Sequence, residues 1–382
     1  MRMFQRRRPR AAAPEVKDSR AARLVAMTSG GRPVWTPRDY ESLAREGFAK
    51  NPVAYRCVRM IAEAAASIPL TVFAGGRRAD DHPLARLLAR PNPEQGGPDL
   101  MEAFFGMLQV SGNGYLEAAG EGPDELYALR PDRMKVAPGR QGWPQAYEYT
   151  VAGRSVRIGR EADGWLPVLH LKLFNPADDH YGASPLEAAA FAIDVHNASG
   201  AWNKALLDNS ARPSGALVYS NPEAGDRLSE AQFETLKAEL EARAGPAAAG
   251  RPLLLEGGLD WRPMSLTPHD MDFIEGKHAA ARDIALAFGV PPQLLGIPGD
   301  NTYANLKEAN GAFWRHTVIP LAERAARALT GWLGARHPGT RIACDLDAAP
   351  ALSAERDALW ARLEAATFLT PQERRRLAGL EQ

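Results

Sequence analysis

The sequence has few cysteines and no long apolar run. Of its 382 residues only two are cysteine, Cys57 and Cys344, which is too few for a disulfide framework. Neither stands in a CxxC pair or at the spacing of a zinc site, so each is interpreted as a small buried hydrophobe in a reducing compartment. A membrane helix needs about 18 or more consecutive apolar residues, and no such run occurs. The sequence therefore predicts neither a disulfide-stapled domain nor a membrane-spanning helix.

A net charge is also lacking. Lys and Arg together number 46, as do Asp and Glu, in a composition of 45% hydrophobic and 24% charged residues that is ordinary for globular proteins. A protein that grips nucleic acid tightly usually carries a basic excess, because neutralised phosphates supply most of the affinity. The balance argues against tight DNA binding. It is compatible with loose contact, in which a neutral surface avoids sticking to DNA.

The signatures of common active sites are absent as well. We find no phosphate-binding loop, no dinucleotide fingerprint and no GxSxG nucleophile elbow. One alternative stays open, a metal cluster among His269, Asp270, Asp272, Glu275 and His278. Carboxylates at a helix start are expected from the helix dipole alone, and matching His and Asp partners are missing elsewhere. The sequence thus predicts no catalytic residue, cofactor or metal, and a soluble metal-dependent enzyme using the His269–His278 region is the alternative hypothesis.

The first segment of the chain, MRMFQRRRPRAAAPEVK, is basic but is not followed by an apolar stretch. It is therefore not expected to be a secretory signal. Its charge and its lack of periodicity predict a disordered arm over residues 1–45.

Residues 46–184 mix helical and strand patterns. Asn51 and the proline after it open a helix with an apolar face at helical spacing, and the LTVF run that follows is typical of a strand. Asp99 is expected to cap a further helix. Between Tyr115 and His170 short strands are separated by Pro and Gly, which predicts a β-rich subdomain of about five strands. This part of the sequence predicts the α+β class.

Two long helices then frame an insertion. The first is predicted over residues 185–211, with Ser184 as its N-cap, and would be ~38 Å long if it is unbroken. The second is predicted over residues 267–290, capped by Thr267 and ended by glycine and two prolines. The insertion at 212–266 has a β-α-β-β pattern with a hairpin turn at Gly257-Gly258.

A polar loop and a long returning helix follow. Gly, Pro, Asp and Asn dominate the loop at 291–303, which is typical of turns. The helix over residues 304–336 contains Pro320, which removes one backbone hydrogen bond and should kink it. Residues 337–382 are predicted to form a short strand and two small helices.

Several motifs stand in the order typical of one protein family. They are NPVAYRCVRMIAEAAASIPL, HPLARLLARPNP, FFGMLQVSGNGYLE, LYALRPDRM, VLHLK with DDHYGASPLEAA, LDWRPMSLTPHDMDFIE, IALAFGVPPQLLG and TYANLKEANGAFWRHTVIPL. Together they make the sequence similar to the portal proteins of long-tailed, double-stranded DNA bacteriophages. No single motif decides this, but the ordered set is specific. The short chain and its richness in Ala, Arg, Gly and Pro also resemble portals of prophage-derived gene transfer agents of alphaproteobacteria.

The resemblance implies a structural portal, or head-tail connector, without catalysis of its own. Its subunits would form a dodecameric ring at one capsid vertex, and DNA would be packaged and ejected through the axis. The implied regions are a wing at 46–184, a first stem helix at 185–211, a clip at 212–266, a second stem helix at 267–290, a tunnel loop at 291–303, a kinked wing helix at 304–336 and a small crown at 337–382.

The resemblance also implies partners and places. The clip would dock the terminase large subunit and later the head-tail adaptor, the major capsid protein would surround the ring, and double-stranded DNA would be contacted transiently and without sequence preference. The protein would occupy the portal vertex of the virion, after assembly in the host cytoplasm and without a membrane. The implied site residues are Gly299, Asp300, Asn301, Thr302, Tyr303, Asn305 and Lys307 in the DNA-facing tunnel loop, Glu275, Lys277 and Arg282 lining the stem, and Glu234, Lys237, Glu241 and Arg243 for docking at the clip.

Overall fold

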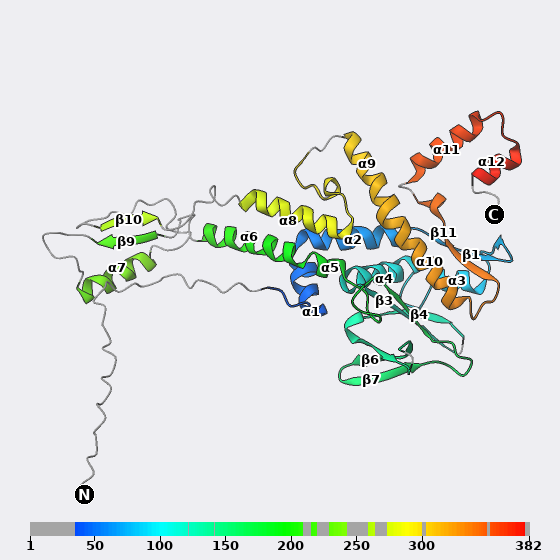
Figure 1. The fold of residues 1–382 in the computed structure, drawn as a ribbon, viewed down its shortest axis with the longest axis horizontal. Coiled ribbons are helices and arrows are strands. Elements are labelled where there is room, and N and C mark those ends of the chain that lie inside the picture. The colour runs from blue at the N-terminus through cyan, green and yellow to red at the C-terminus, as the bar shows by residue number, and fades with distance from the viewer. Residues whose placement is uncertain are drawn as a thin grey trace, which may run out of the picture. The chain divides into compact units, whose positions relative to one another are not determined.

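Helices and short antiparallel strands alternate along the chain, which confirms the predicted α+β class (Figure 1). The structure is a computed structural model that describes residues 35–120, 122–140, 142–208, 215–219, 229–242, 259–263, 273–299, 303–349 and 352–378. Within these ranges no helix is long and apolar enough to cross a membrane.

The helical elements and the strands have the following bounds. The helical segments are α1 Tyr40–Leu43, η1 Ala44–Ala49, α2 Pro52–Ala66, α3 Pro83–Ala89, α4 Gly97–Ser111, η2 Pro131–Arg133, α5 Pro185–Ala188, α6 Ala190–Asp208, α7 Glu230–Ala242, α8 Phe273–Phe288, η4 Pro292–Leu295, α9 Tyr303–Phe313, η5 Trp314–Val318, α10 Ile319–Leu333, η6 Leu346–Ala348, α11 Ser353–Ala365 and α12 Pro371–Leu377. The strands are β1 Leu70–Ala74, β2 Arg77–Arg78, β3 Asn113–Ala119, β4 Glu125–Leu129, β5 Met134–Pro138, β6 Pro144–Val151, β7 Arg154–Gly159, β8 Val168–Lys172, β9 Gly215–Tyr219, β10 Leu259–Pro263 and β11 Thr340–Cys344.

The main hydrophobic core is built around α2 and α4, which pack on each other. Ile61 of α2 and Phe104 and Leu108 of α4 are each at most 1% exposed. α10 adds Leu329 and Leu333 to the same core. Burying one such side chain contributes about 1.5–3 kcal/mol, so the apolar stripes of these three helices hold this part of the protein together.

The predicted arm over residues 1–45 is too long. α1 begins at Tyr40, directly after Asp39, whose carboxylate accepts the N–H of Ser42 at 2.9 Å and so caps the helix. Leu43 is 3% exposed and belongs to the main core. A helix of four residues is too short for its apolar spacing to be visible in the sequence.

The helix expected to be capped by Asp99 begins earlier, at Gly97. The carboxylate of Asp99 instead accepts the N–H of Gly96 at 3.2 Å, as the third helical residue does in a capping box. A Cβ on Gly97 would lie 2.2 Å from the carbonyl oxygen of Leu88, so only glycine allows this approach. Acidic residues are favourable both at the N-cap and in the first turn of a helix. The start of α4 was therefore predicted too late in the sequence.

Two three-stranded antiparallel sheets form the β-rich part, with the strand orders β4-β3-β8 and β5-β6-β7. All the short strands predicted between Tyr115 and His170 are present. A second, smaller core joins the two sheets through Tyr115 of β3, Met134 of β5 and Tyr147 of β6.

His170 is the polar member of this smaller core. Its ring stacks on Tyr115 with the centroids 4.2 Å apart. Its Nε2 lies 3.0 Å from Oδ1 of Asn113, and its Nδ1 lies 3.3 Å from the hydroxyl of Tyr147. A neutral imidazole that donates from Nε2 and accepts at Nδ1 satisfies both contacts. Burial, with nearby positive charge adding to it, lowers the pKa of His170 to about 3.

The C-terminal strand returns to the start of the folded chain. β11 pairs antiparallel with β1 in the sheet β11-β1-β2, where Ile342 stands opposite Val72. Both side chains are at most 3% exposed. The first strand of the region predicted as the crown, residues 337–382, therefore belongs to a sheet with residues 70–78. The sequence pattern showed the strand but not its partner, because the partner lies at the other end of the chain.

The returning helix predicted over residues 304–336 consists of α9, the π-helical turn η5 and α10, one after the other. The N–H of Ile319 donates to the carbonyl of Trp314, five residues back. In a regular α-helix the ring of Pro320 would clash with a carbonyl one turn earlier. The predicted disruption at Pro320 is thus present, and it takes the form of a widened turn directly before the proline.

The first long helix, predicted over residues 185–211, is interrupted. α5 begins after Ser184 as predicted, and the hydroxyl oxygen of Ser184 accepts two backbone N–H groups of the first turn. Ala189 then has ψ −6° and ends α5, and α6 continues from Ala190. Ala189 and Ala190 are 3% and 1% exposed, so the break lies in a buried part of the chain.

Within the insertion at 212–266 the structure describes β9, α7 and β10. β9 and β10 pair antiparallel with Val218 opposite Asp260, and α7 starts directly after Ser229 as predicted. The strand and the glycine turn predicted before β10 lie outside the described residues.

We expect the stability of the protein to fall in mild acid through His170. Because the pKa of His170 is lowered to about 3 in the folded state, the unfolded chain takes up a proton below about pH 6.5 that the folded chain does not. Stability is therefore full above that pH and is lost as the pH falls toward 3, by about 2 kcal/mol at pH 5. Denaturant unfolding at a series of pH values measures the loss. His170→Gln should flatten the pH dependence, and an unchanged slope in this variant would contradict the assignment.

Candidate functional site

The segment that joins α8 to α9 is folded tightly at its start. Gly289 follows α8 with φ 66°, and the N–H of Val290 donates to the carbonyl of Ala285 at 2.9 Å. The hydroxyl of Thr317 in η5 donates to the carbonyl of Gly289 at 2.6 Å. A Cβ at Gly289 would lie 2.9 Å from that hydroxyl oxygen. Both the backbone conformation and the close approach therefore require glycine, and the helix stop predicted here is confirmed.

The chain next turns back over the side of α8, as Figure 1 shows. The short turn η4 ends at Gly296, which has φ 69° and reverses the direction of the chain. Ile297 is then 7% exposed and forms a small cluster with Ala281 and Ala285 of α8. Val53 of α2 packs against the same cluster, so the turned-back segment contacts both α8 and the main helical core.

Arg282 holds the far end of this turned-back segment. Its Nη2 donates to the carbonyl of Pro298 at 2.7 Å. This use was not foreseen, because Arg282 was predicted to line the stem. The described part of the loop ends one residue later, at the exposed Gly299.

The other predicted tunnel-loop residues are divided between the loop and α9. Residues 300–302 lie outside the described residues. Tyr303 is the first residue of α9, and Asn305 and Lys307 are exposed on its first two turns. That these residues face DNA stays a prediction.

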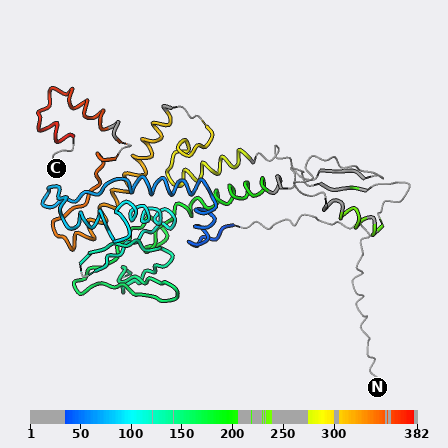
Figure 2. Tube along the Cα trace, turned by 180° about the vertical axis from the view of Figure 1, so that it is seen from behind, coloured from blue at the N-terminus to red at the C-terminus, as the bar shows by residue number. Residues whose placement is uncertain are grey.

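The predicted stem helices lie side by side, as the two views of the chain and the contacts between α6 and α8 agree (Figures 1 and 2). Glu275 is exposed on α8, and Lys277 is half-buried. Burial, and to a smaller extent the charge of Lys277, lowers the pKa of His196 on α6. The stem-lining role of Glu275 and Lys277 remains a prediction.

Asn51 joins this helix pair to the rest of the fold. It is 0% exposed, and each of its hydrogen-bonding positions is used. Its Oδ1 accepts the N–H groups of Val53 and Ala54 at 3.1 and 3.0 Å, which caps α2. Its Nδ2 lies 3.2 Å from Nδ1 of His196 and donates to Oδ1 of Asn197 at 3.0 Å. One buried side chain thus starts α2 and holds α6.

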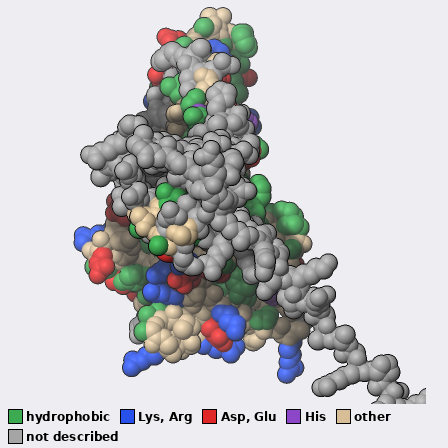
Figure 3. Space-filling model, turned by 90° about the vertical axis from the view of Figure 1, so that its left-hand side faces the viewer, with side chains coloured by type: hydrophobic (Ala, Val, Ile, Leu, Met, Phe, Trp, Pro, Cys, Tyr) green, Lys and Arg blue, Asp and Glu red, His purple; other side chains and the backbone are tan. Residues whose placement is uncertain are grey.

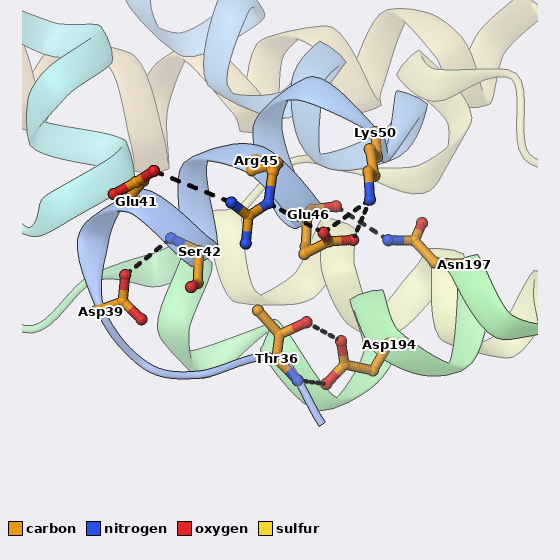
Figure 4. Close-up of polar contacts among 9 residues, drawn as sticks. All are labelled: Thr36, Asp39, Glu41, Ser42, Arg45, Glu46, Lys50, Asp194 and Asn197. Carbon is orange, nitrogen blue, oxygen red and sulfur yellow. Dashed lines mark hydrogen bonds and ion pairs between the residues drawn. The ribbon is translucent and has the colours of Figure 1, made fainter. Parts of the chain in front are cut away.

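Further contacts bind the same part of α6 to the segment before α2 (Figure 4). Asn197 donates from Nδ2 to the carbonyl of Glu46 at 2.9 Å. Thr36 donates to the carboxylate of Asp194 from its N–H at 3.1 Å and also from its hydroxyl. The carboxylate of Glu46 pairs with Lys50 at 2.8 Å, and this contact lowers the pKa of Glu46. We call these contacts, together with those of Asn51, the stem junction.

The stem junction is a feature that the sequence analysis missed. Asn51 was recognised as a helix start, but nothing in the spacing shows that its amide faces α6 as well. A groove of about 610 Å³ between η1, α2 and α4 was also missed, with Tyr55, Arg59 and Met107 among its lining residues. Helical periodicity identifies an apolar face but does not distinguish a packed face from one that lines a groove.

The predicted docking residues of the clip lie on or after α7. Glu234 is exposed and Lys237 is half-buried. Glu241 belongs to the last turn of α7, but the structure does not describe its side chain, and Arg243 lies outside the described residues. Their docking role stays a prediction.

The alternative metal site falls largely outside the described residues, since these do not include His269, Asp270 or Asp272. Glu275 is exposed and His278 is half-buried. In the part of the chain that the structure describes, no group of three or more His, Cys, Asp or Glu residues could hold a metal ion.

Comparisons with known proteins agree with one another. The family described as phage portal protein matches residues 52–379. An uncharacterized protein of Rickettsia bellii (strain RML369-C) is 42% identical over 341 residues, which cover 88% of each chain. A chain in the neck of an empty gene transfer agent particle, computed with C6 symmetry, is 54% identical with a TM-score of 0.72, covering 91% of this chain and 95% of that one. A chain in the neck of the native particle, computed with C12 symmetry, is 53% identical with a TM-score of 0.70 and the same coverage.

We expect the replacement Asn51→Ala to destabilise the protein by about 2–4 kcal/mol. The loss of a helix cap costs about 1 kcal/mol, and the polar groups of α6 left without their buried partner cost about 1–3 kcal/mol more. Denaturant unfolding of the full chain measures the change. Thr370→Ala is the matched control, because Thr370 caps α12 at an exposed position. Equal effects of the two replacements would show that the contact between Asn51 and α6 contributes nothing.

Proposed function

The chain belongs to the phage portal protein family, and from this premise we propose that it forms a dodecameric ring whose axial channel conducts double-stranded DNA. The observation that carries the proposal is the 53% identity, over 91% of the chain, to a chain in a particle neck computed with C12 symmetry. Membership of this family also makes the protein a structural component rather than an enzyme. The alternative metal-dependent enzyme has no support from the relatives.

The place of the protein is the neck of a phage or gene transfer agent particle. Two solved relatives at more than 50% identity belong to the necks of gene transfer agent particles. We propose that the subunits meet in the host cytoplasm during assembly, before the ring becomes part of the virion. We also propose that the ring contacts DNA without sequence preference.

The charge of the chain suits a conduit. Lys and Arg balance Asp and Glu at 46 each. On the face seen in Figure 3, basic and acidic side chains of the described residues lie near one another rather than in a field of one sign. Because each neutralised phosphate adds to affinity, a channel of mixed charge releases DNA more readily than a basic one. DNA can then slide during packaging and ejection.

The stem pair carries apolar side chains that a ring would cover. Phe191 of α6 and Ile274 and Leu286 of α8 are 62%, 66% and 78% exposed. Exposed apolar residues grouped on neighbouring elements mark interaction surfaces. In a closed ring each subunit covers its neighbour through a head-to-tail contact, and we propose that these side chains lie in that contact.

The remaining regions are assigned as the family resemblance implies. We propose that Glu275 and Lys277 line the stem, and that the loop from Gly299, with Asn305 and Lys307 on the helix after it, meets DNA. The exposed position of Gly299, Asn305 and Lys307 is compatible with this role. We propose that Trp360 and Phe368, which are 50% and 84% exposed, belong to the crown together with α11 and α12.

The proposed partners follow from the same assignment. The clip, represented in the described residues by β9, α7 and β10, would dock the terminase large subunit and then the head-tail adaptor. Glu234 on the exposed side of α7 is a candidate contact. The major capsid protein would surround the wing.

Imaging of the purified full-length protein, or of particles that contain it, tests the proposal. We expect rings of C12 symmetry with a central channel wide enough for duplex DNA. A compact monomer that stays monomeric inside particles would contradict the proposal.

The replacement Leu286→Glu should weaken ring formation by at least about tenfold. It places a charge in the proposed contact between subunits, from which water is excluded when the ring forms. The fold of the subunit should not change, since Leu286 is 78% exposed. Mass photometry gives the fraction of rings, and circular dichroism gives the fold. Val156→Glu is the control, since Val156 is 62% exposed on β7, outside the stem pair. Equal ring fractions for both variants would place Leu286 outside the contact.

Replacing His269 and His278 together by Ala discriminates the conduit from the metal enzyme. We expect the double variant to form rings and to package DNA at the level of the parent, because a conduit has no use for a metal there. Loss of packaging in particles whose rings are intact would favour the alternative.

A further inference from the structure

The base of the loop between α8 and α9 is held against the side of α8 rather than at its end. Three contacts to different elements hold it. The hydroxyl of Thr317 in η5 donates to the carbonyl of Gly289. The side chain of Ile297 packs on α8 and on α2. Arg282 of α8 donates to the carbonyl of Pro298.

The contact of Arg282 decides where the loop leaves the helix. Arg282 precedes Gly289 by two helical turns, a distance of roughly 10 Å along the axis of α8. The chain therefore returns along α8 by about that length before it reaches the exposed Gly299. Pro298 has no N–H to donate, so its carbonyl is the backbone group through which this end of the segment can be held.

We propose that Arg282 is a positioning residue that sets the level along the stem at which the loop meets DNA. The inference rests on the proposed function, in which this loop faces the channel. This role differs from the stem-lining role that was predicted for Arg282. A guanidinium that donates to a backbone carbonyl of its own subunit points along that subunit and not into the channel.

The physical consequence concerns the length of chain that can move. While the bond between Arg282 and Pro298 is present, residues 290–298 are part of the folded subunit. Without it, their far end loses one of its contacts, the packing of Ile297 remains, and residues 290–298 can be displaced more easily. The reach of a flexible chain grows with its length, so the level at which the loops meet DNA would become variable and their hold on DNA weaker.

Hydrogen exchange in the assembled full-length protein tests the anchor in the absence of DNA. Arg282→Met keeps an unbranched, flexible side chain and removes the donors. We expect exchange in residues 293–299 to become about fivefold faster, the effect of losing one hydrogen bond, with the rest of the chain unchanged. Arg282→Lys, which keeps one donor, should restore most of the protection. Lys277→Met removes the same charge from the same helix and should leave this segment as in the parent.

The DNA content of particles made with the same variants tests the consequence. We expect particles with Arg282→Met to retain at least about twofold less DNA than those with Arg282→Lys. Unchanged exchange in Arg282→Met would overturn the anchor itself. Faster exchange with undiminished DNA would leave the anchor in place and overturn the proposed contact of this loop with DNA. An equal loss of DNA in Arg282→Lys, although its exchange is restored, would show that the DNA content does not depend on the anchor.

Discussion

The arrangement of α6 and α8, the two predicted stem helices, depends on one buried amide. Asn51 is 0% exposed, and such a group is tolerated in a core only when its donors and acceptors are all used. Its oxygen serves α2 and its nitrogen serves α6, so neither helix can shift without leaving polar atoms unpaired in the interior. Since α8 packs on α6 and the loop base packs on α8, the positions of both depend in turn on this contact.

A second set of contacts fixes the opposite end of the long returning helix. The indole of Trp165 donates to the carbonyl of Trp332 at 3.0 Å, and the indole of Trp332 donates to the carbonyl of Leu166 at 2.8 Å. The guanidinium of Arg336 lies 4.4 Å from the centroid of the Trp165 ring. These contacts lock α10 to the segment before β8. The π-helical turn at η5 takes up the misfit that Pro320 introduces between α9 and the locked α10.

Features with a local cause could be predicted from the sequence, and features with a distant partner could not. The cap at Ser184, the stop at Gly289 and the disruption at Pro320 follow from the chemistry of one residue and its neighbours. The pairing of β11 with β1, the second role of Asn51 and the bond of Arg282 join segments far apart in the chain. The family resemblance predicted the regions and their order. It also led to the prediction that Arg282 lines the stem, because the sequence shows the position of Arg282 on α8 but not its bond to Pro298.

The anchored loop base and the symmetry of the ring together have a consequence for sliding. If each loop is held at one level of its own α8, a dodecameric ring presents its loops as a single collar around the DNA. A turn of duplex DNA contains about 10–10.5 base pairs, so a twelvefold collar cannot place all its loops in the same relation to the phosphates at once. As the duplex moves, some contacts form while others break, and the summed energy varies little along the path. A collar at a fixed level can therefore keep contact with DNA without stopping it, whereas loops at varying levels would lose that averaging.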